Sequence, residues 1–268
     1  MDETWKTAVS KVERNSILLR GYPIEQLIGV VSFGEAVYLT LRGELPKRNE
    51  GRMIEAILVS VIDHGPTPPS SLTARTIATT GAELNAAVAG GILAISHYHG
   101  GAIEECMQAL HEAVEFQRQK DVSLQEAAQW LVASHQRAHR RIAGYGHRLH
   151  TDDPRTKRLL QLAEQLGVSG AYIQMATAIE SAMKQAYGKD LPINADGAIA
   201  AILCDMEFPP ILADAFFMIA RVPGLVAHVI EERTRFKPMR RLHRTDIEYD
   251  GPAERQLQRI SEKEPAEV

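Results

Sequence analysis

Four segments of the chain combine histidine, aspartate or arginine with glycine. They are residues 63–70 (DHGPTPPS), 97–102 (HYHGGA), 144–155 (GYGHRLHTDDPR) and 193–198 (INADGA). Glycine has no Cβ, so it lets a ligand approach the backbone closely. Together the segments supply histidine donors, a carboxylate and several arginines. These are the groups that enolate chemistry next to a carbonyl requires.

Each kind of group has a task in such chemistry. A carboxylate, for which Asp196 is the candidate, removes a proton from the carbon next to a thioester. A neutral histidine donates a hydrogen bond to the developing enolate oxygen, and a second histidine moves a proton on the carbonyl or hydroxyl that reacts. Arginines hold a polycarboxylate because the guanidinium fork matches its oxygens.

The segment 97–102 ends one expected helix and begins another. A histidine at a helix start is kept neutral by the local positive potential, so it can act as a hydrogen-bond donor. The alternative is a metal site, because His97-x-His99 is a common ligand pair. No third ligand at helical spacing accompanies it, and the chain has no His-Glu-x-x-His, so we expect no metal.

Two other segments have equally plain structural explanations. His64 could donate a hydrogen bond to an anionic substrate, or it could be a histidine favoured by the dipole at a helix C-terminus. Asn194 or Asp196 could simply cap the helix that follows. In the sharper interpretation, Asp196 faces a cleft and desolvation adjusts its pKa toward that of a base.

The glycine-rich segment 144–155 exposes backbone amides, and Arg155 lies in the first turn of the expected next helix. Arg148, Arg155 and that helix N-terminus could bind carboxylates or phosphates; a surface loop is the alternative. No strand pattern precedes the Gly-x-Gly, so a Rossmann nucleotide site is not expected.

Helical periodicity must position these segments. Apolar residues between 53 and 62 recur on one helix face, and residues 84–97 predict a buried helix. Ser123 and Glu126 form a capping box, and Asp153-Pro154 predicts a helix that ends near Leu166, before Gly167. Further helices are expected at 171–187, 194–206 and 210–232.

The expected fold class is all-α, with about ten or more helices and an active site in a cleft between packed helices. Strand alternation is almost absent, apart from a short extended piece near residues 245–249. The tail after Gly251 is polar, and we expect it to be partly disordered.

Bulk properties narrow the classes further. The 268 residues carry a net charge of −4, which argues against a nucleic-acid binder. Cys106 and Cys204 lie far apart in apolar segments and predict buried free thiols. The N-terminus shows no signal peptide and no apolar stretch is long enough to span a bilayer. We therefore expect a cytoplasmic protein without a membrane partner.

The motifs and their order resemble the citrate synthase superfamily. The likeness begins at residues 20–27 (RGYPIEQL), continues through 32–39 (SFGEAVYL) and 43–46 (GELP), and runs to about residue 240, so it covers most of the chain. It implies the multi-helical citrate synthase fold, with a large helical core and a smaller lobe. It also implies coenzyme A thioester substrates and no permanently bound cofactor.

The resemblance assigns roles position by position. His99 matches the histidine that stabilises the acetyl-CoA enol, His147 matches the one at the oxaloacetate carbonyl or citryl hydroxyl, and Asp196 matches the base at the acetyl methyl. The positions that match dicarboxylate-binding residues are His64, Arg155 and Arg221. The positions where the family receives coenzyme A are Tyr145, Gly146, Arg148 and Asn194.

Several departures concern length and one arginine. Only about sixteen residues separate Gly-Glu-Leu-Pro from Asp63-His64, where typical synthases carry a long helical insert. The family's His-Gly-Gly-Ala-Asn-Glu has Ile103 in place of Asn, and the loop from His147 to Arg155 is one residue shorter. The substrate arginine that a partner subunit supplies is replaced by Lys237, which lacks the bidentate fork. Arg240 or Arg241 could compensate.

The short form resembles stand-alone citryl-CoA lyases and the matching module of ATP-citrate lyase. It therefore implies cleavage of citryl-CoA to acetyl-CoA and oxaloacetate. The alternatives are a short citrate or 2-methylcitrate synthase, and an inactive helical acyl-CoA sensor. The resemblance also implies a homodimer or higher homo-oligomer that uses small-molecule substrates.

We expect a discontinuous large helical domain made of residues 1–100 and 190–250. Residues 101–189 would form a small helical domain with the coenzyme A loop, and residues 251–268 a polar tail.

Overall fold

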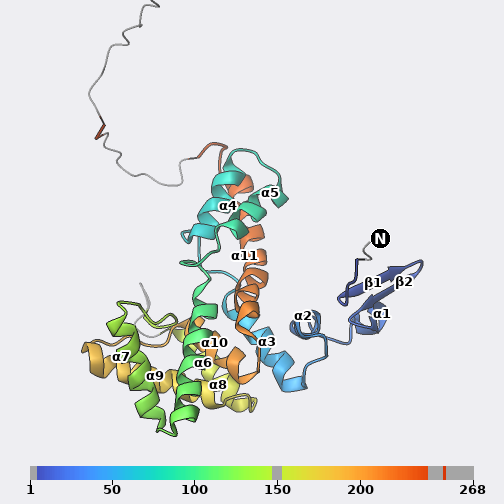
Figure 1. Cartoon of the computed structure of the whole chain (residues 1–268). Coiled ribbons are helices and arrows are strands. Elements are labelled where there is room, and N and C mark those ends of the chain that lie inside the picture. The colour runs from blue at the N-terminus through green and yellow to red at the C-terminus, as the bar shows by residue number, and fades with distance from the viewer. Residues whose placement is uncertain (1–4, 147–152, 241–249, 252–268) are drawn as a thin grey trace, which may run out of the picture.

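The computed structural model describes residues 5–146, 153–240 and 250–251. About 63% of this part is helical, so the prediction of an all-α fold is confirmed. The helices of the described part, shown in Figure 1, are α1 (Ile24–Leu27), α2 (Phe33–Arg42), α3 (Arg48–Ser60), α4 (Pro69–Thr79), α5 (Leu84–Leu93), α6 (Ala102–Lys120), α7 (Leu124–Arg137), α8 (Pro154–Gln165), α9 (Ala171–Tyr187), α10 (Ala195–Asp205), the 3-10 helix η1 (Pro210–Leu212) and α11 (Ala213–Arg235).

The helix-start signals in the sequence correspond to real caps. The Ser123 side chain accepts a hydrogen bond from the Glu126 amide, and the Glu126 side chain accepts one from the Ser123 amide, which closes a capping box at α7. Asp153 caps α8 by accepting from the Arg155 amide. Gly167 follows α8 with φ +69°, a conformation that favours glycine.

A small three-stranded antiparallel sheet precedes the helices, and the sequence pattern did not predict it. The strands are β1 (Ser10–Glu13), β2 (Ser16–Leu19) and β3 (Tyr22–Pro23). Two-residue turns join them. Strands of two to four residues are too short to show a clear alternation of apolar and polar residues. β1 is exposed throughout, and in Figure 1 the sheet lies beside the main helical body, to which α2 connects it. The extended piece expected near 245–249 lies outside the described residues.

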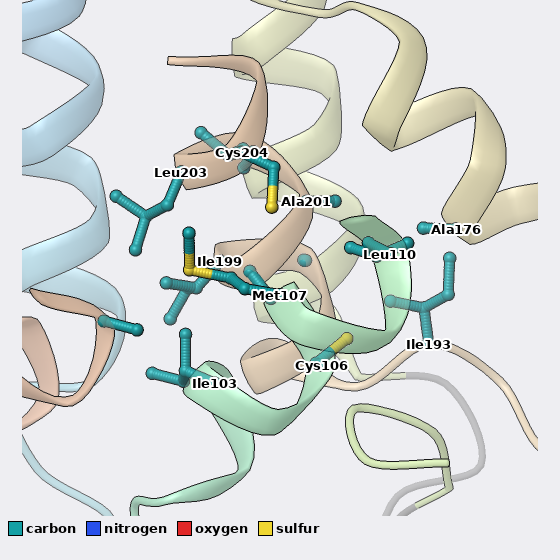
Figure 2. Packing of buried hydrophobic residues seen from close by; sticks show 14 of the residues in the cluster. Ile103, Cys106, Met107, Leu110, Ala176, Ile193, Ile199, Ala201, Leu203 and Cys204 are labelled. Carbon is teal, nitrogen blue, oxygen red and sulfur yellow. The ribbon is translucent and has the colours of Figure 1, made fainter. Parts of the chain in front are cut away.

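The main core forms where α6, α9 and α10 pack together (Figure 2). α10 is buried along most of its length, because its alanine, isoleucine and leucine side chains meet helices on several sides. Cys106 and Cys204 are buried in this core and unbridged, as predicted. Burial raises the pKa of the Cys106 thiol to about 12, so it stays protonated at neutral pH.

A smaller apolar cluster joins α4, α5 and α11. The prediction of a buried helix over 84–97 is wrong in two respects. α5 ends at Leu93, and within it only Ala87 and Gly91 are buried. The helix is apolar all round, but only one face packs against α4 and α11, which leaves Leu93 84% exposed.

α11 runs through both clusters, with Phe216 in the first and Val229 in the second. Pro210–Arg235 is the only stretch of the described chain whose length and composition would allow it to cross a membrane. Core helices pass the same test, and α11 buries two charged side chains, Arg221 and Glu232. The stretch is therefore weak evidence for a membrane span. The division of the chain at residues 101 and 189 stays a prediction.

Candidate active site

A cavity of about 940 Å³ opens between the turn after α3, the loop before α6, the segment before α8, and the helices α10 and α11. The side chains of several predicted site residues meet there from sequence positions far apart. The predicted residues that line the cavity are His64, His99, Tyr145, Arg155, Asn194, Asp196 and Arg221.

His99 is held by the N-terminus of α4. Its Nε2 lies 2.8 Å from the hydroxyl of Ser70 and 3.4 Å from the Ser70 amide. Because a backbone N–H can only donate, Nε2 accepts and the ring proton is assigned to Nδ1. Burial, followed by the charge of Arg221 and the neighbouring His64, lowers the pKa of His99 to about 4. The ring is therefore neutral at pH 7 and can donate a hydrogen bond.

The expected neutral histidine is thus present, but its own helix start is not the main cause. α6 begins at Ala102, and the helix N-terminus next to the ring is that of α4. His97 also lines the cavity, where its Nδ1 lies 3.2 Å from Glu105. In the described part of the chain, no three His, Cys, Asp or Glu side chains are arranged to hold a metal ion.

Asp196 lies in the first turn of α10. Desolvation raises the pKa of its carboxyl, while Arg155 and Arg221 oppose the rise. The helix cap is the neighbouring residue, Asn194, whose side-chain oxygen accepts from the Gly197 amide at 3.1 Å. The capping explanation therefore holds for Asn194, and it leaves the Asp196 carboxyl available to the cavity.

Residues 144–146 pair with residues 192–194 in a strand-like manner. The Asn194 side-chain amide donates to the Gly146 carbonyl at 2.8 Å, and the Asn194 backbone amide donates to the Gly144 carbonyl at 3.0 Å. A Cβ on Gly197 would lie 2.2 Å from that Gly144 oxygen. Glycine at 197 thus allows the loop to contact the start of α10. The Tyr145 hydroxyl donates to Ala176 of α9.

Arg221 is a buried cation beside the cavity, with 1% of its surface exposed. Its Nε donates to the Val61 carbonyl at 3.1 Å, and its guanidinium lies 4.5 Å from the Phe217 ring centroid. Its Nη1 is buried and has no hydrogen-bond partner among the described residues. A buried charged donor without a partner is costly, so this nitrogen indicates an anionic ligand.

Arg155 lines the cavity while paired with its own helix cap. Its Nε lies 3.0 Å and its Nη2 2.7 Å from the two carboxylate oxygens of Asp153. This bidentate pair holds the guanidinium plane in one orientation.

Four predicted site residues are not among those that line the described cavity. Gly146 lies beside it, with its carbonyl bound to the Asn194 side chain. His147 and Arg148 lie outside the described residues, and Lys237 is exposed in the segment after α11 and does not line the cavity. Arg240, offered as a substitute, already pairs with Glu232, with Nε 2.8 Å from Oε1. Arg241 lies outside the described residues.

Sequence patterns missed some residues at the site. Ser70 is the last residue of the segment 63–70 but had no predicted role, and Phe217 has the pattern of an ordinary core residue. Arg140 and Arg141 line the cavity beside the 144–146 loop. Unlike Ser70 and Phe217, these two arginines are marked in the sequence, because their paired charge indicates a site for a small anionic ligand.

Comparison with known proteins confirms the multi-helical fold that the motifs imply. The family model described as citrate synthase, C-terminal domain, matches residues 46–244. The chain belongs to the citrate synthase family. A Bacillus subtilis member of the family, "Citrate/2-methylcitrate synthase", is 31% identical over 83% of this chain and 57% of its own length. The chain spans 57 to 60% of the length of this relative and of Mycobacterium tuberculosis "Putative citrate synthase 2", which is 29% identical.

Among solved structures of the family, the citryl-CoA lyase from Hydrogenobacter thermophilus is 43% identical. It matches with a TM-score of 0.87 over 96% of this chain and 98% of the other. An ATP citrate lyase from Methanosaeta concilii, solved with (3S)-citryl-CoA, matches with a TM-score of 0.81 at 20% identity, over 95% of this chain and 43% of the other. The second likeness shows the shared fold alone.

Proposed function

We propose that the protein is a citryl-CoA lyase that cleaves citryl-CoA to acetyl-CoA and oxaloacetate. The observation that carries the proposal is the cavity that combines the neutral His99 ring, the Asp196 carboxyl and the partnerless Nη1 of Arg221. The end-to-end match in length with a solved citryl-CoA lyase favours cleavage over synthesis.

In the proposed cleavage, His147 takes the proton of the tertiary hydroxyl. The carbon–carbon bond then breaks, the alkoxide becomes the ketone of oxaloacetate, and the bonding electrons form the acetyl-CoA enolate. The Nδ1–H of His99 donates a hydrogen bond to the enolate oxygen. Asp196, whose pKa is raised by desolvation, returns a proton to the carbon. The same groups serve the reverse condensation.

Binding would divide between two ends of the cavity. His64, Arg155 and Arg221 would hold the dicarboxylate half. Residues 144–148 and Asn194 would receive coenzyme A, with Arg140 and Arg141 near its phosphates. The thioester is a substrate, and we expect no permanent cofactor.

We also propose a homodimer or higher homo-oligomer. Apolar side chains are exposed on the outer side of α5 and α11 and just beyond α11, with Leu93 at 84%, Ile230 at 49% and Met239 at 74% exposure. A second copy would cover them, and Lys237 would act in the partner's site. The protein would be cytoplasmic, without nucleic-acid or membrane partners.

The test is to incubate the protein with citryl-CoA, and separately with acetyl-CoA plus oxaloacetate. Release of acetyl-CoA and oxaloacetate from the first mixture supports the lyase. Rapid release of free coenzyme A from the second, with no cleavage in the first, would overturn it in favour of a short citrate synthase. The name of the Bacillus subtilis relative supports testing propionyl-CoA as well.

An inactive acyl-CoA sensor is the candidate from another class. It predicts that Asp196→Ala exchanges the methyl protons of acetyl-CoA as fast as the wild type. An exchange rate that falls in the variant would exclude the sensor.

A further inference from the structure

The turn that carries His64 is seated on one face of α11. Arg221 donates from Nε to the Val61 carbonyl at 3.1 Å. One turn of helix further, a Cβ on Gly224 would lie 2.5 Å from the Ile62 carbonyl oxygen. His228 follows on the same face, because positions 221, 224 and 228 have the spacing of neighbours on a helix. α11 therefore contacts this turn at three successive levels.

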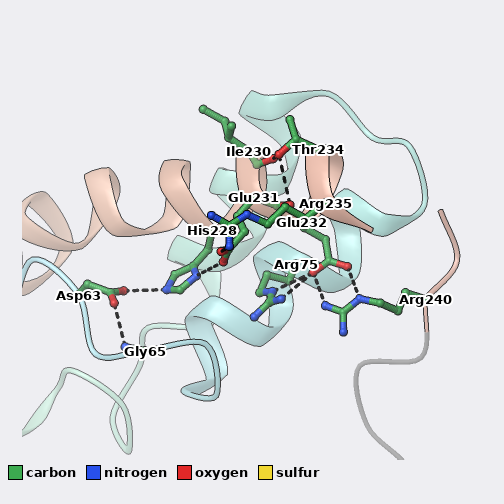
Figure 3. A network of polar contacts seen from close by, with 10 residues as sticks. All are labelled: Asp63, Gly65, Arg75, His228, Ile230, Glu231, Glu232, Thr234, Arg235 and Arg240. Carbon is green, nitrogen blue, oxygen red and sulfur yellow. Dashed lines mark hydrogen bonds and ion pairs between the residues drawn. The ribbon is translucent and has the colours of Figure 1, made fainter. Parts of the chain in front are cut away.

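His228 reaches the turn through Asp63. Its Nε2 lies 3.0 Å from Oδ1 of Asp63, and the other carboxylate oxygen, Oδ2, accepts from the Gly65 amide at 2.9 Å (Figure 3). The carboxylate thus closes an Asx turn from residue 63 to residue 65. His64 is the central residue of this turn, so the orientation of Asp63 sets the direction in which His64 leaves the backbone.

The contact between His228 and Asp63 is partly shielded from solvent. The His228 side chain is 14% exposed and the Asp63 side chain 37% exposed. Burial raises the pKa of Asp63, but the Gly65 amide and His228 outweigh it, so the pKa is lowered and the carboxylate is charged. On the far side of the ring, Nδ1 of His228 lies 3.8 Å from Glu231. The Nε2 atom of His228 thus faces the turn, and its Nδ1 atom faces Glu231 of its own helix.

We infer that His228 is a positioning residue, which fixes the Asp63 carboxylate and thereby holds His64 in the cavity for the dicarboxylate half of the substrate. The identity of the ligand rests on the proposed function, whereas the contacts among His228, Asp63 and Gly65 do not depend on it. The Nε2 contact with Asp63 does the positioning, and the Nδ1 contact with Glu231 does not.

Substitution of His228 by glutamine or by asparagine tests the roles of the two ring nitrogens separately. Glutamine at position 228 can place its NH₂ near the site of Nε2, whereas asparagine can place its NH₂ only near the site of Nδ1. His228→Gln should retain oxaloacetate binding within about threefold of the wild type, and His228→Asn should weaken it about tenfold or more, because small displacements of a positioned group are costly. Affinity for acetyl-CoA should be unchanged in both. Arg235→Gln, which removes only the exposed pair with Glu231, is the control.

Oxaloacetate and acetyl-CoA binding are measured by calorimetry on the purified full chain, with thermal unfolding alongside. A loss of both affinities in step with a lower melting temperature would indicate a merely structural role and would overturn the inference. Equal oxaloacetate affinities in the two amide variants would overturn it as well.

Hydrogen exchange of the Gly65 amide tests the geometry without any substrate. Protection should fall in His228→Asn and persist in His228→Gln. If the wild type binds no oxaloacetate, the proposed function fails, and the exchange result still decides whether His228 holds the turn. Equal protection in wild type and His228→Asn would refute the positioning role.

Discussion

Nε2 of His99 accepts from Ser70, whose hydroxyl lies 2.8 Å away at the start of α4. This contact orients the imidazole and assigns its proton to Nδ1. The neutral state comes from burial and neighbouring positive charge. Orientation and charge state thus have separate origins, so they can be perturbed separately.

Ser70→Ala should lower kcat for citryl-CoA cleavage about tenfold, which corresponds to one lost hydrogen bond of about 1–1.5 kcal/mol. The measurement is steady-state release of acetyl-CoA. Ser71→Ala is the matched control, because the Ser71 hydroxyl is equally buried but has no hydrogen-bond partner in the described part of the chain. Equal losses in the two variants would contradict a specific role for Ser70.

The lowered pKa of His99 predicts a pH dependence of stability. The unfolded chain takes up a proton near pH 6.5 and the folded chain only near pH 4, so the unfolded state binds more protons in this window. The free energy of unfolding should therefore fall as the pH drops from about 6.5 toward about 4. Urea unfolding at several pH values should give a shallower fall for His99→Gln. Parallel curves for the two proteins would contradict the shift.

Arg221→Met should abolish stabilisation by oxaloacetate. A ligand at a hundredfold excess over its Kd stabilises the folded state by about 2.7 kcal/mol. We expect the corresponding rise in melting temperature in the wild type but not in Arg221→Met. Arg42→Met is the matched control, because Arg42 also contacts a backbone carbonyl, that of Glu207, and a phenylalanine ring, but away from the cavity. Loss of the ligand effect in both variants would argue against a carboxylate site at Arg221.

Gly197→Ala should destabilise the protein by about 1–3 kcal/mol, the usual cost of overpacking. Its Cβ would lie 2.2 Å from the Gly144 carbonyl oxygen, and backbone cannot easily move aside. In Gly90→Ala, the Cβ meets only the tip of the Ile77 side chain, which can rotate. Urea unfolding gives the free energy of unfolding of both variants, and we expect the smaller loss in Gly90→Ala. A Gly197→Ala variant as stable as the wild type would contradict the close approach.

Local signals predicted the helices well where caps and periodicity coincide. α9 spans Ala171–Tyr187, as expected, because Gly170 and Gly188 flank an uninterrupted apolar pattern. The sheet of residues 10–23 was missed because its strands have two to four residues. The burial of α5 was overestimated, because composition does not tell which side of an apolar helix has a neighbour.

The site was predictable to the extent that family motifs mark it. Seven predicted residues line one cavity, although no local pattern places Asp196 near Arg221. The support behind them was not predictable. Ser70 contacts His99 from a helix start 29 residues away in the sequence, and His228 contacts Asp63 from 165 residues away. Such contacts depend on tertiary packing, which spacing along the chain does not encode.

The Asn194 amide uses both of its ends, its oxygen as the cap of α10 and its nitrogen as the tether of the Gly146 carbonyl. Asn194 therefore couples the loop expected to receive coenzyme A to the helix start that bears Asp196, so that the two segments should move together. A chimera that takes only one of these two segments from a homologue would disturb the hydrogen bonds that join them. Recombination of specificity between relatives should succeed only when residues 144–146 and 192–197 are transplanted together.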